Sequence, residues 1–338
     1  MYQYQADILA QPTALRDTLD SLHESVLPNQ ISDRFREGGW KRILLTGMGS
    51  SYFALLPLQL RLLEAGFPVW LVETSELIYS DAYLTPETLL VVASQSGASA
   101  ETVRLLDECG SQLTILGVTN TDTSPLARRS TYCIVTRAGE EASVSCKTYL
   151  ATLAAQLWLG DQLIDGAPRF SELQKLPQVV ESYLDAWQQH VSELKPVLEG
   201  VKQFYLTGRG VSIAAAGTGG LIMKESVRMP AEGMSSAAFR HGPFEMTGPE
   251  TFVLVFAGSG KLVALNKKLA NDVAKAQGRS ALVETGTGAG VFTLPSVPVS
   301  ALPLLEILPV QMITLAMAEV LNIQAGHFHL GTKITVIE

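Results

Sequence analysis

Apolar residues in the first half of the chain occur in short runs that alternate with longer amphipathic stretches. Five runs rich in β-branched and aliphatic residues predict strands, at 43–46, 69–73, 89–94, 114–119 and 133–136. Between these runs lie stretches with apolar residues at helical spacing, for example 52–65 and 100–109. The alternation is typical of βαβ units, so we expect an α/β fold with a doubly wound, mostly parallel sheet between two layers of helices.

The second half of the chain repeats two motifs of the first half. The segment 45–51 (LTGMGSS) returns as 206–212 (LTGRGVS), and 88–97 (TLLVVASQSG) returns as 251–260 (TFVLVFAGSG). The two shifts are nearly equal, at 161 residues (47 to 208) and 163 residues (88 to 251). We therefore expect two copies of one α/β domain. The predicted boundaries place the first domain and an N-terminal helix at 1–165, a linker and connecting helix at 166–200, and the second domain with a C-terminal tail at 201–338.

One late stretch, 301–320, is apolar along almost its whole length. It contains Glu306, Gln311 and Glu319, whose polar groups are costly inside a bilayer. We therefore predict a helix in the core or at an interface, and no membrane span.

Composition narrows the choice of partners and compartment. The chain has 25 Lys and Arg against 33 Asp and Glu, a net charge of −8, and no polybasic run, so neither nucleic acid nor an anionic membrane is expected as a partner.

Charged residues make up 17% of the chain, below the roughly 25% of an average domain, which predicts a homodimer that covers part of the surface. Three irregularly spaced cysteines and no apolar leader favour a cytoplasmic location. His327 and His329 have no cluster of other ligands near them in the sequence, so no metal site is expected.

A glycine-rich turn follows the first predicted strand. The segment 47–51 (GMGSS) precedes a helix, and its backbone N–H groups and the helix N-terminus suit an anion. A dinucleotide site is an alternative, because Glu73 ends the next strand where a ribose-binding acid would stand. Tyr52 occupies the position of the third glycine of that fingerprint, which disfavours the dinucleotide.

A second loop, 94–99 (SQSGAS), follows the third predicted strand and precedes a helix that begins near Ala100. Its hydroxyls and N–H groups suit a phosphate monoester, bound by neutral donors and a helix dipole without arginine. The plain alternative is that these serines only cap a helix. Two such loops in adjacent βα units favour the phosphate.

Four motifs together resemble the sugar isomerase (SIS) domain family: 47–51 (GMGSS), 94–97 (SQSG), 240–243 (RHGP) and 333–336 (KITV). The resemblance covers nearly the whole chain. Within that family it resembles the isomerase half of glucosamine-6-phosphate synthase, amino-sugar-phosphate deaminases and fructosamine-6-phosphate deglycases. The resemblance implies two tandem SIS domains and a small-molecule sugar phosphate as ligand, with no cofactor.

The resemblance also implies a role for individual residues. The phosphate would be held by Ser50, Ser51, Ser94, Gln95, Ser96 and Ser99. The sugar would be lined by Gly49, Val144 and Ser145. Glu225 would move a proton between adjacent carbons, and His241, commonly supplied by a neighbouring subunit, would open the sugar ring. Lys333 falls where the synthase carries a lysine that can form a Schiff base with an open ketose.

The residue types suit this chemistry, although each has a plainer interpretation. A desolvated glutamate is a better base, histidine moves protons near pH 7, and a neutral lysine amine attacks a carbonyl. Glu225 could instead pair with Lys224 or Arg228 on a solvated helix face. His241 could cap a loop, and Lys333 could be a surface charge.

Two departures from the synthase shape the expected reaction. The sequence has no glutaminase segment ahead of the first domain and no cysteine at position 2, so we expect no ammonia from glutamine within this chain. Ile222 stands three residues before Glu225, where the synthase carries a lysine that assists proton movement, and Gly219 and Gly220 are expected to leave extra room.

We therefore expect an enzyme, a deglycase or deaminase that acts on an amino-sugar or ketosamine 6-phosphate through an enediol-type intermediate. One alternative is a glucosamine-6-phosphate deaminase coupled to aldose–ketose isomerisation. Another, of a different class, is a non-catalytic phosphosugar-sensing module. Glu225, His241 and the lack of a basic DNA-binding segment favour the enzyme.

Overall fold

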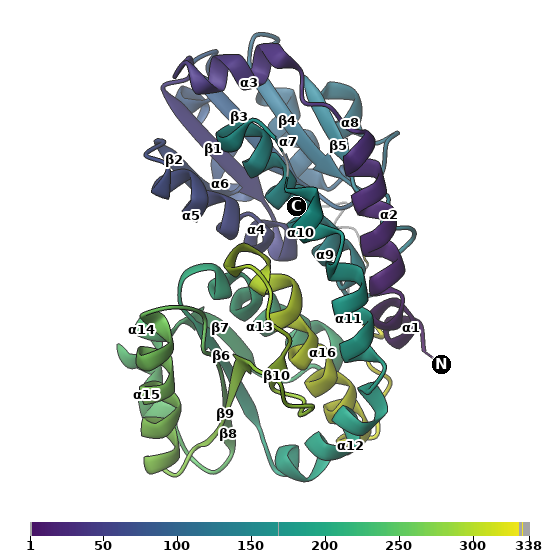
Figure 1. Ribbon diagram of the computed structural model, residues 1–338, viewed down its shortest axis with the longest axis vertical. Helices are drawn as coiled ribbons and strands as arrows, with labels where there is room; N and C mark the ends of the chain where they lie inside the picture. The colour runs from purple at the N-terminus through teal and green to yellow at the C-terminus, as the bar shows by residue number, and fades with distance from the viewer. Residues whose placement is uncertain (1, 168, 331–332, 334–338) are drawn as a thin grey trace. The chain divides into compact units, whose positions relative to one another are not determined.

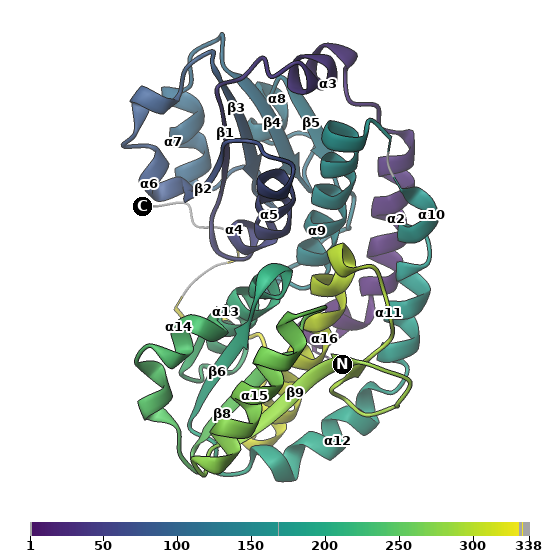
Figure 2. The same ribbon diagram turned by 60° about the vertical axis from the view of Figure 1, so that its left-hand side comes forward.

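The computed structural model describes residues 2–167, 169–330 and 333. The chain forms two compact units, which we describe separately (Figures 1 and 2). The N-terminal unit comprises 11–141, 146–177 and the C-terminal tail from 330. The C-terminal unit comprises 1–10, 142–145 and 178–329.

The N-terminal unit is built on a five-stranded sheet with the order β2-β1-β3-β4-β5. Every neighbouring pair of these strands is parallel, as predicted. The strands are β1 (Arg42–Gly47), β2 (Val69–Glu73), β3 (Thr88–Ala93), β4 (Thr114–Thr119) and β5 (Tyr132–Val135). The helices are α2 (Gln11–Glu24), α3 (Asn29–Arg36), α4 (Gly49–Ala54), α5 (Leu56–Glu64), α6 (Thr74–Leu77), α7 (Ala100–Glu108), α8 (Pro125–Arg129), α9 (Lys147–Gly160) and α10 (Phe170–Leu173).

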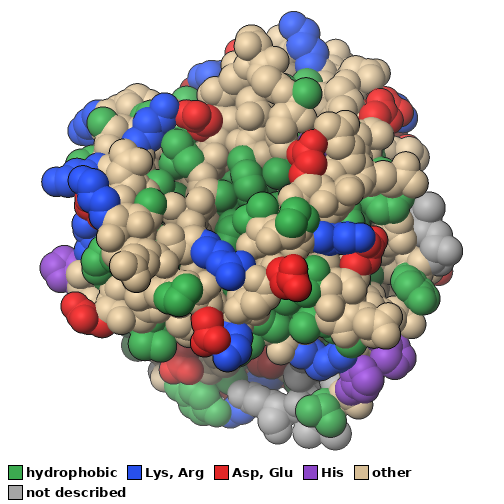
Figure 3. Space-filling view, turned by 90° about the horizontal axis from the view of Figure 1, so that it is seen from below, with side chains coloured by type: hydrophobic (Ala, Val, Ile, Leu, Met, Phe, Trp, Pro, Cys, Tyr) green, Lys and Arg blue, Asp and Glu red, His purple; other side chains and the backbone are tan. Residues whose placement is uncertain are grey.

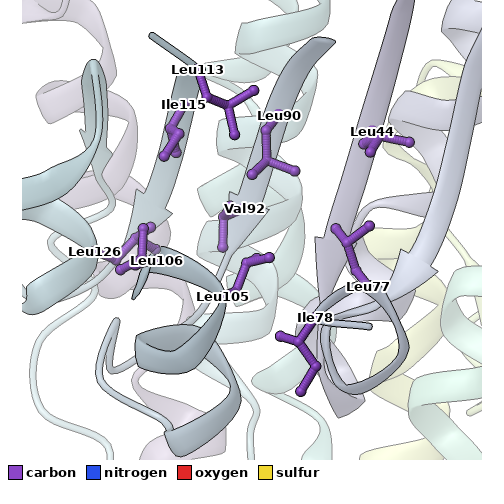
Figure 4. Packing of buried hydrophobic residues seen from close by; sticks show 10 residues of the cluster. All are labelled: Leu44, Leu77, Ile78, Leu90, Val92, Leu105, Leu106, Leu113, Ile115 and Leu126. Atoms are coloured by element: carbon purple, nitrogen blue, oxygen red, sulfur yellow. The ribbon is translucent and has the colours of Figure 1, made fainter. Parts of the chain in front are cut away.

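Helices cover this sheet on both faces, which is why its central strand is apolar at every position after Thr88. All six residues of β3 are buried. On one face, Leu44, Leu90 and Val92 pack against Leu105 and Leu106 of α7, as Figure 4 shows. On the other face lie α5 and α9, and every residue of α9 is buried (Figure 2). Burial of this apolar area is the main stabilising contribution to the unit.

The C-terminal unit contains a second parallel sheet, with the order β10-β9-β8-β6-β7. From the β7 edge, the strands follow one another in the same chain-order pattern as in the first sheet. The strands are β6 (Gln203–Gly208), β7 (Ala231–Ser235), β8 (Thr251–Phe256), β9 (Arg279–Thr285) and β10 (Thr293–Leu294). The helices are α1 (Gln3–Leu9), α11 (Leu176–Leu184), α12 (Trp187–Leu198), α13 (Ile213–Val227), α14 (Ser236–Arg240), α15 (Leu262–Lys275) and α16 (Leu302–Val320). An α/β fold of two parallel sheets flanked by helices is thus confirmed.

The limits of two helices and the placement of the N-terminal helix differ from the sequence-based expectation. The helix predicted over 52–65 is divided into α4 and α5, and the stretch 166–200, predicted as a linker and one connecting helix, contains α11 and α12 as two separate helices. Helix α1 groups with the C-terminal unit, where the Tyr4 hydroxyl lies 3.1 Å from Thr314 Oγ1. The domain boundaries at 165 and 200 therefore stay a prediction.

Helix α16 is buried in the C-terminal unit, where it packs against α12 and α13. By length and composition alone 299–320 could cross a bilayer, but its apolar window is entirely buried inside the protein. That burial fits the core helix predicted for this stretch. On the surface shown in Figure 3, basic and acidic side chains are interspersed.

Candidate functional site

The strand order of the N-terminal unit creates a topological switch point between β1 and β3. From β1 the chain continues to β2 on one side, whereas β3 and the strands after it lie on the other side. Gly47 and Ala93, the last residues of β1 and β3, are paired in register. The loops that follow them, 47–51 and 94–99, therefore start side by side at the edge where open α/β sheets bind ligands.

The first loop needs glycine because it passes close to β3. A Cβ atom at Gly47 would lie 2.9 Å from the Ala93 carbonyl oxygen, closer than any side chain tolerates. Gly49 has φ +53°, a left-handed conformation that glycine adopts without strain, and it begins α4. Ser50 and Ser51 follow in the first turn of α4, and both are half-buried. Their hydroxyls are therefore placed beside the N–H groups at the start of a helix.

The second loop is fixed by hydrogen bonds to the strand beside it. The Ser94 N–H donates to the Val118 carbonyl at 3.0 Å, and the Asn120 N–H donates to the Gln95 carbonyl at 3.0 Å. Gly97 has φ +61°, and a Cβ atom there would lie 2.3 Å from Ser124 Oγ. These bonds and the tight packing hold the loop in one shape before any ligand binds, which lowers the entropic cost of binding.

The serines of the second loop also bond within the loop. Ser94 Oγ accepts from the Gly97 N–H at 3.2 Å, and Ser96 Oγ accepts from the Ala98 N–H at 3.2 Å. Ser99 caps α7, because its hydroxyl accepts from the Thr102 N–H at 3.4 Å. The capping alternative therefore holds for Ser99. A hydroxyl that accepts a bond still has its own proton to donate, so Ser94 and Ser96 keep donors suited to an anion.

Lys333 belongs to the N-terminal unit and forms an ion pair there. Its Nζ atom lies 2.6 Å from Glu141 Oε2, and its side chain is 20% exposed while that of Glu141 is fully buried. Lys333 is therefore a partly buried, ion-paired residue, and its role in the reaction stays a prediction. The sequence analysis did not identify Glu141 as a site residue. Its sequence pattern is only that of an acidic residue ahead of an apolar helix, which is common at helix N-termini.

Glu141 is one of the best-satisfied carboxylates described. Its Oε1 atom accepts from the N–H groups of Cys146 at 3.0 Å and Thr148 at 3.1 Å, and Oε2 accepts from the Thr148 hydroxyl. Burial alone would raise the pKa of Glu141. The Lys333 ammonium and the bonds from Thr148 and Cys146 outweigh burial, so this pKa lies below its ordinary value.

Hydrogen bonds through Asn120 connect the segment that precedes Glu141 to the second loop. The Asn120 side chain accepts from the Ala138 N–H at 2.7 Å and donates to the Gly139 carbonyl at 2.8 Å. The backbone of Asn120 is bonded to Gln95, as described above. Only one residue separates Gly139 from Glu141, so the ion pair lies near the carboxyl edge of the sheet, on the same side as the serine loops.

In the C-terminal unit, the segment 142–145 lies beside the end of α13. The Gly326 N–H donates to the Ser226 carbonyl at 2.9 Å, and the Gly326 carbonyl accepts from the Ser143 hydroxyl. The buried Val144 and half-buried Ser145 follow Ser143, and the half-buried Glu225 precedes Ser226. The structure therefore brings these three predicted site residues to one region of the unit.

Within this chain, Glu225 and His241 lie toward opposite ends of β7. Helix α13 crosses the strand where Gly220 approaches Gly233, since a Cβ atom on Gly220 would lie 2.4 Å from the Gly233 nitrogen. Glu225, further along α13, lies toward the start of β7, whereas His241 follows α14, beyond the end of the strand. The five-residue strand spans roughly 16 Å, and His241 is exposed. One chain therefore does not place these two groups together.

Two expectations for α13 can be examined directly. Ile222 is fully buried in the unit, as its apolar side chain requires. Gly219 and Gly220 do not leave extra room, because a Cβ atom on Gly219 would lie 2.6 Å from Leu206 and one on Gly220 would meet the backbone of β7. That expectation was wrong. These glycines allow the helix to pack closely on β6 and β7.

Possible metal ligands are scattered. His327 and His329 have ring centroids 4.9 Å apart, in an edge-to-face contact. In the part of the chain that the structure describes, no group of three or more His, Cys, Asp or Glu side chains is arranged to hold a metal ion.

Residues 39–162 match the SIS domain. The chain is 29% identical over 329 residues to a glutamine–fructose-6-phosphate aminotransferase (isomerizing) of Pyrococcus horikoshii, covering 92% of this chain and 54% of that protein. The chain thus spans about half the length of the curated relatives it matches.

Solved structures share the fold. The C-terminal domain of the glucosamine-fructose-6-phosphate aminotransferase of Francisella tularensis aligns with a TM-score of 0.85 at 20% identity, covering 97% of this chain and 99% of that one. A glucosamine-6-phosphate deaminase of Thermotoga maritima aligns with a TM-score of 0.82 at 18% identity, covering 99% of this chain and 100% of that one.

Proposed function

From the membership of residues 39–162 in the SIS domain family, we propose that this chain is an enzyme acting on an amino-sugar or ketosamine 6-phosphate. The observation that carries the proposal is the pairing of two hydroxyl-rich loops, 47–51 and 94–99, at the switch point of the first sheet. The reaction is loss or transfer of the nitrogen substituent by a deglycase or deaminase. A solved structure of the same fold is a glucosamine-6-phosphate deaminase, which supports this class.

We also propose that both halves of the chain are SIS domains in tandem, although the family match covers only the first half. The second sheet has the same strand order as the first, and the two repeated motifs include the ends of corresponding strands, β1 and β6 for one motif and β3 and β8 for the other. We place the enzyme in the cytoplasm, as the cysteine content suggests.

The phosphate is held in this proposal by neutral donors. Ser50 and Ser51 at the start of α4, and Ser94, Ser96 and Ser99 ahead of α7, supply hydroxyls, and Gln95 supplies an amide. The N-termini of two helices add a favourable dipole. Because no arginine is needed, the site would bind a compact dianion without a bulky side chain beside the sugar.

The base in this proposal is Glu225, which removes a proton from the carbon next to the carbonyl of the open sugar. The electron pair moves to the carbonyl oxygen, which takes up a proton and gives an enediol-type intermediate, and the first proton is then returned to the neighbouring carbon. The nitrogen is left as an imine, to which water adds, so that the C–N bond breaks and the amine leaves while the carbon keeps the oxygen of water. Val144 and Ser145 lie in the region of Glu225 and would line the sugar chain.

His241 would open the ring in the active site of a second copy. The separation of Glu225 and His241 along β7 supports this assignment, because one chain does not bring them together. A homodimer would then be needed for a complete site.

A substrate screen tests the proposal. Purified protein is incubated with glucosamine 6-phosphate, fructose 6-phosphate and fructosamine 6-phosphates that carry different amines. Released ammonia, amine and sugar phosphate are quantified separately. We expect turnover of at least one nitrogen-bearing sugar phosphate. Tight binding of sugar phosphates with no turnover of any of them would make the chain a sensor and overturn the enzyme proposal.

A further inference from the structure

Residues 94–97 form a β-turn at the end of β3, in which the Gly97 N–H donates to the Ser94 carbonyl at 3.1 Å. The central peptide of this turn joins Gln95 to Ser96, and a flip of that peptide interconverts the two common turn types. A type II turn requires a positive φ angle at its third residue. Ser96 does not have a positive φ angle, so the turn is not of type II and its central peptide points the other way.

Two donors at the end of β4 hold the Gln95 carbonyl in this orientation. The Asn120 N–H donates to it at 3.0 Å, and the Thr119 hydroxyl donates to it at 3.1 Å. A carbonyl oxygen has two lone pairs, so both are engaged. Thr119 is the last residue of β4 and is 1% exposed, so little water competes with its hydroxyl.

We propose that Thr119 is a positioning residue, whose hydroxyl fixes the direction in which the Ser96 N–H points. The peptide between Gln95 and Ser96 is trans, so its carbonyl and its N–H point in opposite directions. Because the carbonyl points to β4, the N–H points away from β4. Strand β3 lies between β4 and β1, so this direction leads toward the switch point.

The direction matters for the phosphate. Across the described part of the chain, no residue accepts a hydrogen bond from the Ser96 N–H, which leaves this donor for an anion at the switch point. A flipped peptide would present the Gln95 carbonyl oxygen there instead, and that oxygen repels a phosphate. This inference rests on the phosphate site of the proposed function and adds a residue that does not itself touch the ligand.

The rest of the loop follows the same pattern. The Gly97 carbonyl accepts from the Leu126 N–H of α8 at 3.0 Å. The carbonyls of Gln95 and Gly97 therefore both face the segment 119–126, on the side of the loop away from the proposed anion. Thr119 also packs closely against the turn, because a Cβ atom on Gly97 would lie 2.8 Å from Thr119 Oγ1. A loop that turns its carbonyls to one side and its N–H groups to the other suits an anion.

Two substitutions separate the hydroxyl of Thr119 from its methyl group. Thr119→Val keeps the shape and removes the donor, whereas Thr119→Ser keeps the donor and removes the methyl group. Binding of inorganic phosphate and of fructose 6-phosphate to the full-length protein is measured by calorimetry. We expect Thr119→Val to weaken both by about three- to tenfold, the effect of one lost hydrogen bond, and Thr119→Ser to stay within about twofold of the wild type.

Thr88→Val is the matched control. Thr88 is buried and its hydroxyl donates to the Tyr83 carbonyl at 2.6 Å, but it is the first residue of β3 and lies at the opposite edge of the sheet. This variant should keep the wild-type affinity for both probes. A loss of affinity in Thr88→Val equal to that in Thr119→Val would show a general effect of a lost buried hydroxyl and would overturn the inference.

The order of the Thr119 variants decides between positioning and packing. Equal affinities in Thr119→Val and the wild type would overturn the inference. Weaker binding by Thr119→Ser than by Thr119→Val would also overturn it, because the methyl group would then carry the effect. If Thr119→Val does not fold, Thr119→Ala takes its place. Thr119→Ala and Thr119→Ser differ only in the hydroxyl, and the inference requires Thr119→Ala to bind more weakly.

The proposed function and this inference fail on different results. Binding of fructose 6-phosphate without turnover of any substrate in the screen would overturn the enzyme proposal, while the ratio of affinities would still decide the role of Thr119. Turnover together with equal affinities in all Thr119 variants would overturn this inference alone. No binding of either probe by the wild type would overturn both.

Discussion

The buried carboxylate of Glu306 allows a quantitative prediction for the stability of the C-terminal unit. Glu306 lies in α16, and its Oε1 atom accepts from the Ser212 hydroxyl at 2.7 Å. Its Oε2 atom is buried and has no hydrogen-bond partner among the described residues. Burial is the main cause that raises the pKa of Glu306 to about 7, and the bond from Ser212 opposes the rise only in part.

The magnitude follows from the difference between the folded and unfolded chains. The ordinary value of 4.5 and the folded value of about 7 differ by about 2.5 units, or roughly 3 kcal/mol at about 1.4 kcal/mol per unit. Between these pH values the folded protein keeps a proton that the unfolded chain has released. The free energy of unfolding therefore falls as the pH rises through this window, and the whole penalty is present above pH 7.

The substitution Glu306→Gln removes the ionisation and keeps a partner for Ser212. We expect the variant to gain stability relative to the wild type as the pH rises from 5 to 8, by up to about 3 kcal/mol. The assay is urea unfolding at a series of pH values, followed by hydrogen exchange of peptides from α16, so that it reports on this unit alone. The control is Glu319→Gln, on the same helix but with a 53% exposed side chain paired to Lys195. Parallel pH profiles for Glu306→Gln and the wild type would refute the reasoning.

Three further predictions concern the site and the fold. Ser96→Ala should weaken sugar-phosphate binding by roughly 1.5–3 kcal/mol in calorimetry, whereas Ser182→Ala, at an exposed position of α11, should not, and equal affinities would place the anion elsewhere. Glu225→Gln and His241→Asn should each lower kcat, by roughly 10²- to 10⁴-fold for Glu225→Gln. After the two inactive proteins are mixed and reassembled, about a quarter of wild-type activity should return if the histidine is supplied across a dimer, and none should return if it acts within its own chain. Gly220→Ala should destabilise the C-terminal unit by about 1–3 kcal/mol, because its methyl group would overlap the backbone of β7, and an unchanged urea midpoint would contradict the close packing.

The sequence contained enough information for the strands of the first sheet and for the repeat. Strands β2 and β4 match the predicted ranges, because buried parallel strands appear as continuous apolar runs. The loops after β1 and β3 could be predicted because glycine and serine residues directly follow these apolar runs. The predicted ends of the helices were less accurate than those of the strands. At residues 185–186 the chain leaves the helix between α11 and α12, and the apolar periodicity on either side does not reveal the break.

The candidate site was only partly accessible to sequence reasoning. The Glu141–Lys333 pair joins residues 192 positions apart, and no local pattern encodes such a contact. Gly219 and Gly220 were misinterpreted because a missing side chain can mean either an open space or a close neighbour. Only the surroundings decide, and here Leu206 and the backbone of β7 fill the space. The roles of Glu225 and His241 stay predictions.

The four residues 142–145 give the chain an unusual connectivity. The polypeptide leaves the N-terminal unit after Glu141, contributes Ala142–Ser145 to the C-terminal unit and returns at Cys146. Helix α1, near the N-terminus, belongs to the C-terminal unit, whereas Leu330 and Lys333, near the C-terminus, belong to the N-terminal unit. A cut between Pro177 and Gln178 would therefore leave each fragment without pieces that its own fold incorporates. The repeat suggests two separable halves, yet we expect that neither half folds when it is produced alone. A split-protein design should therefore keep 1–10 and 142–145 together with 178–329.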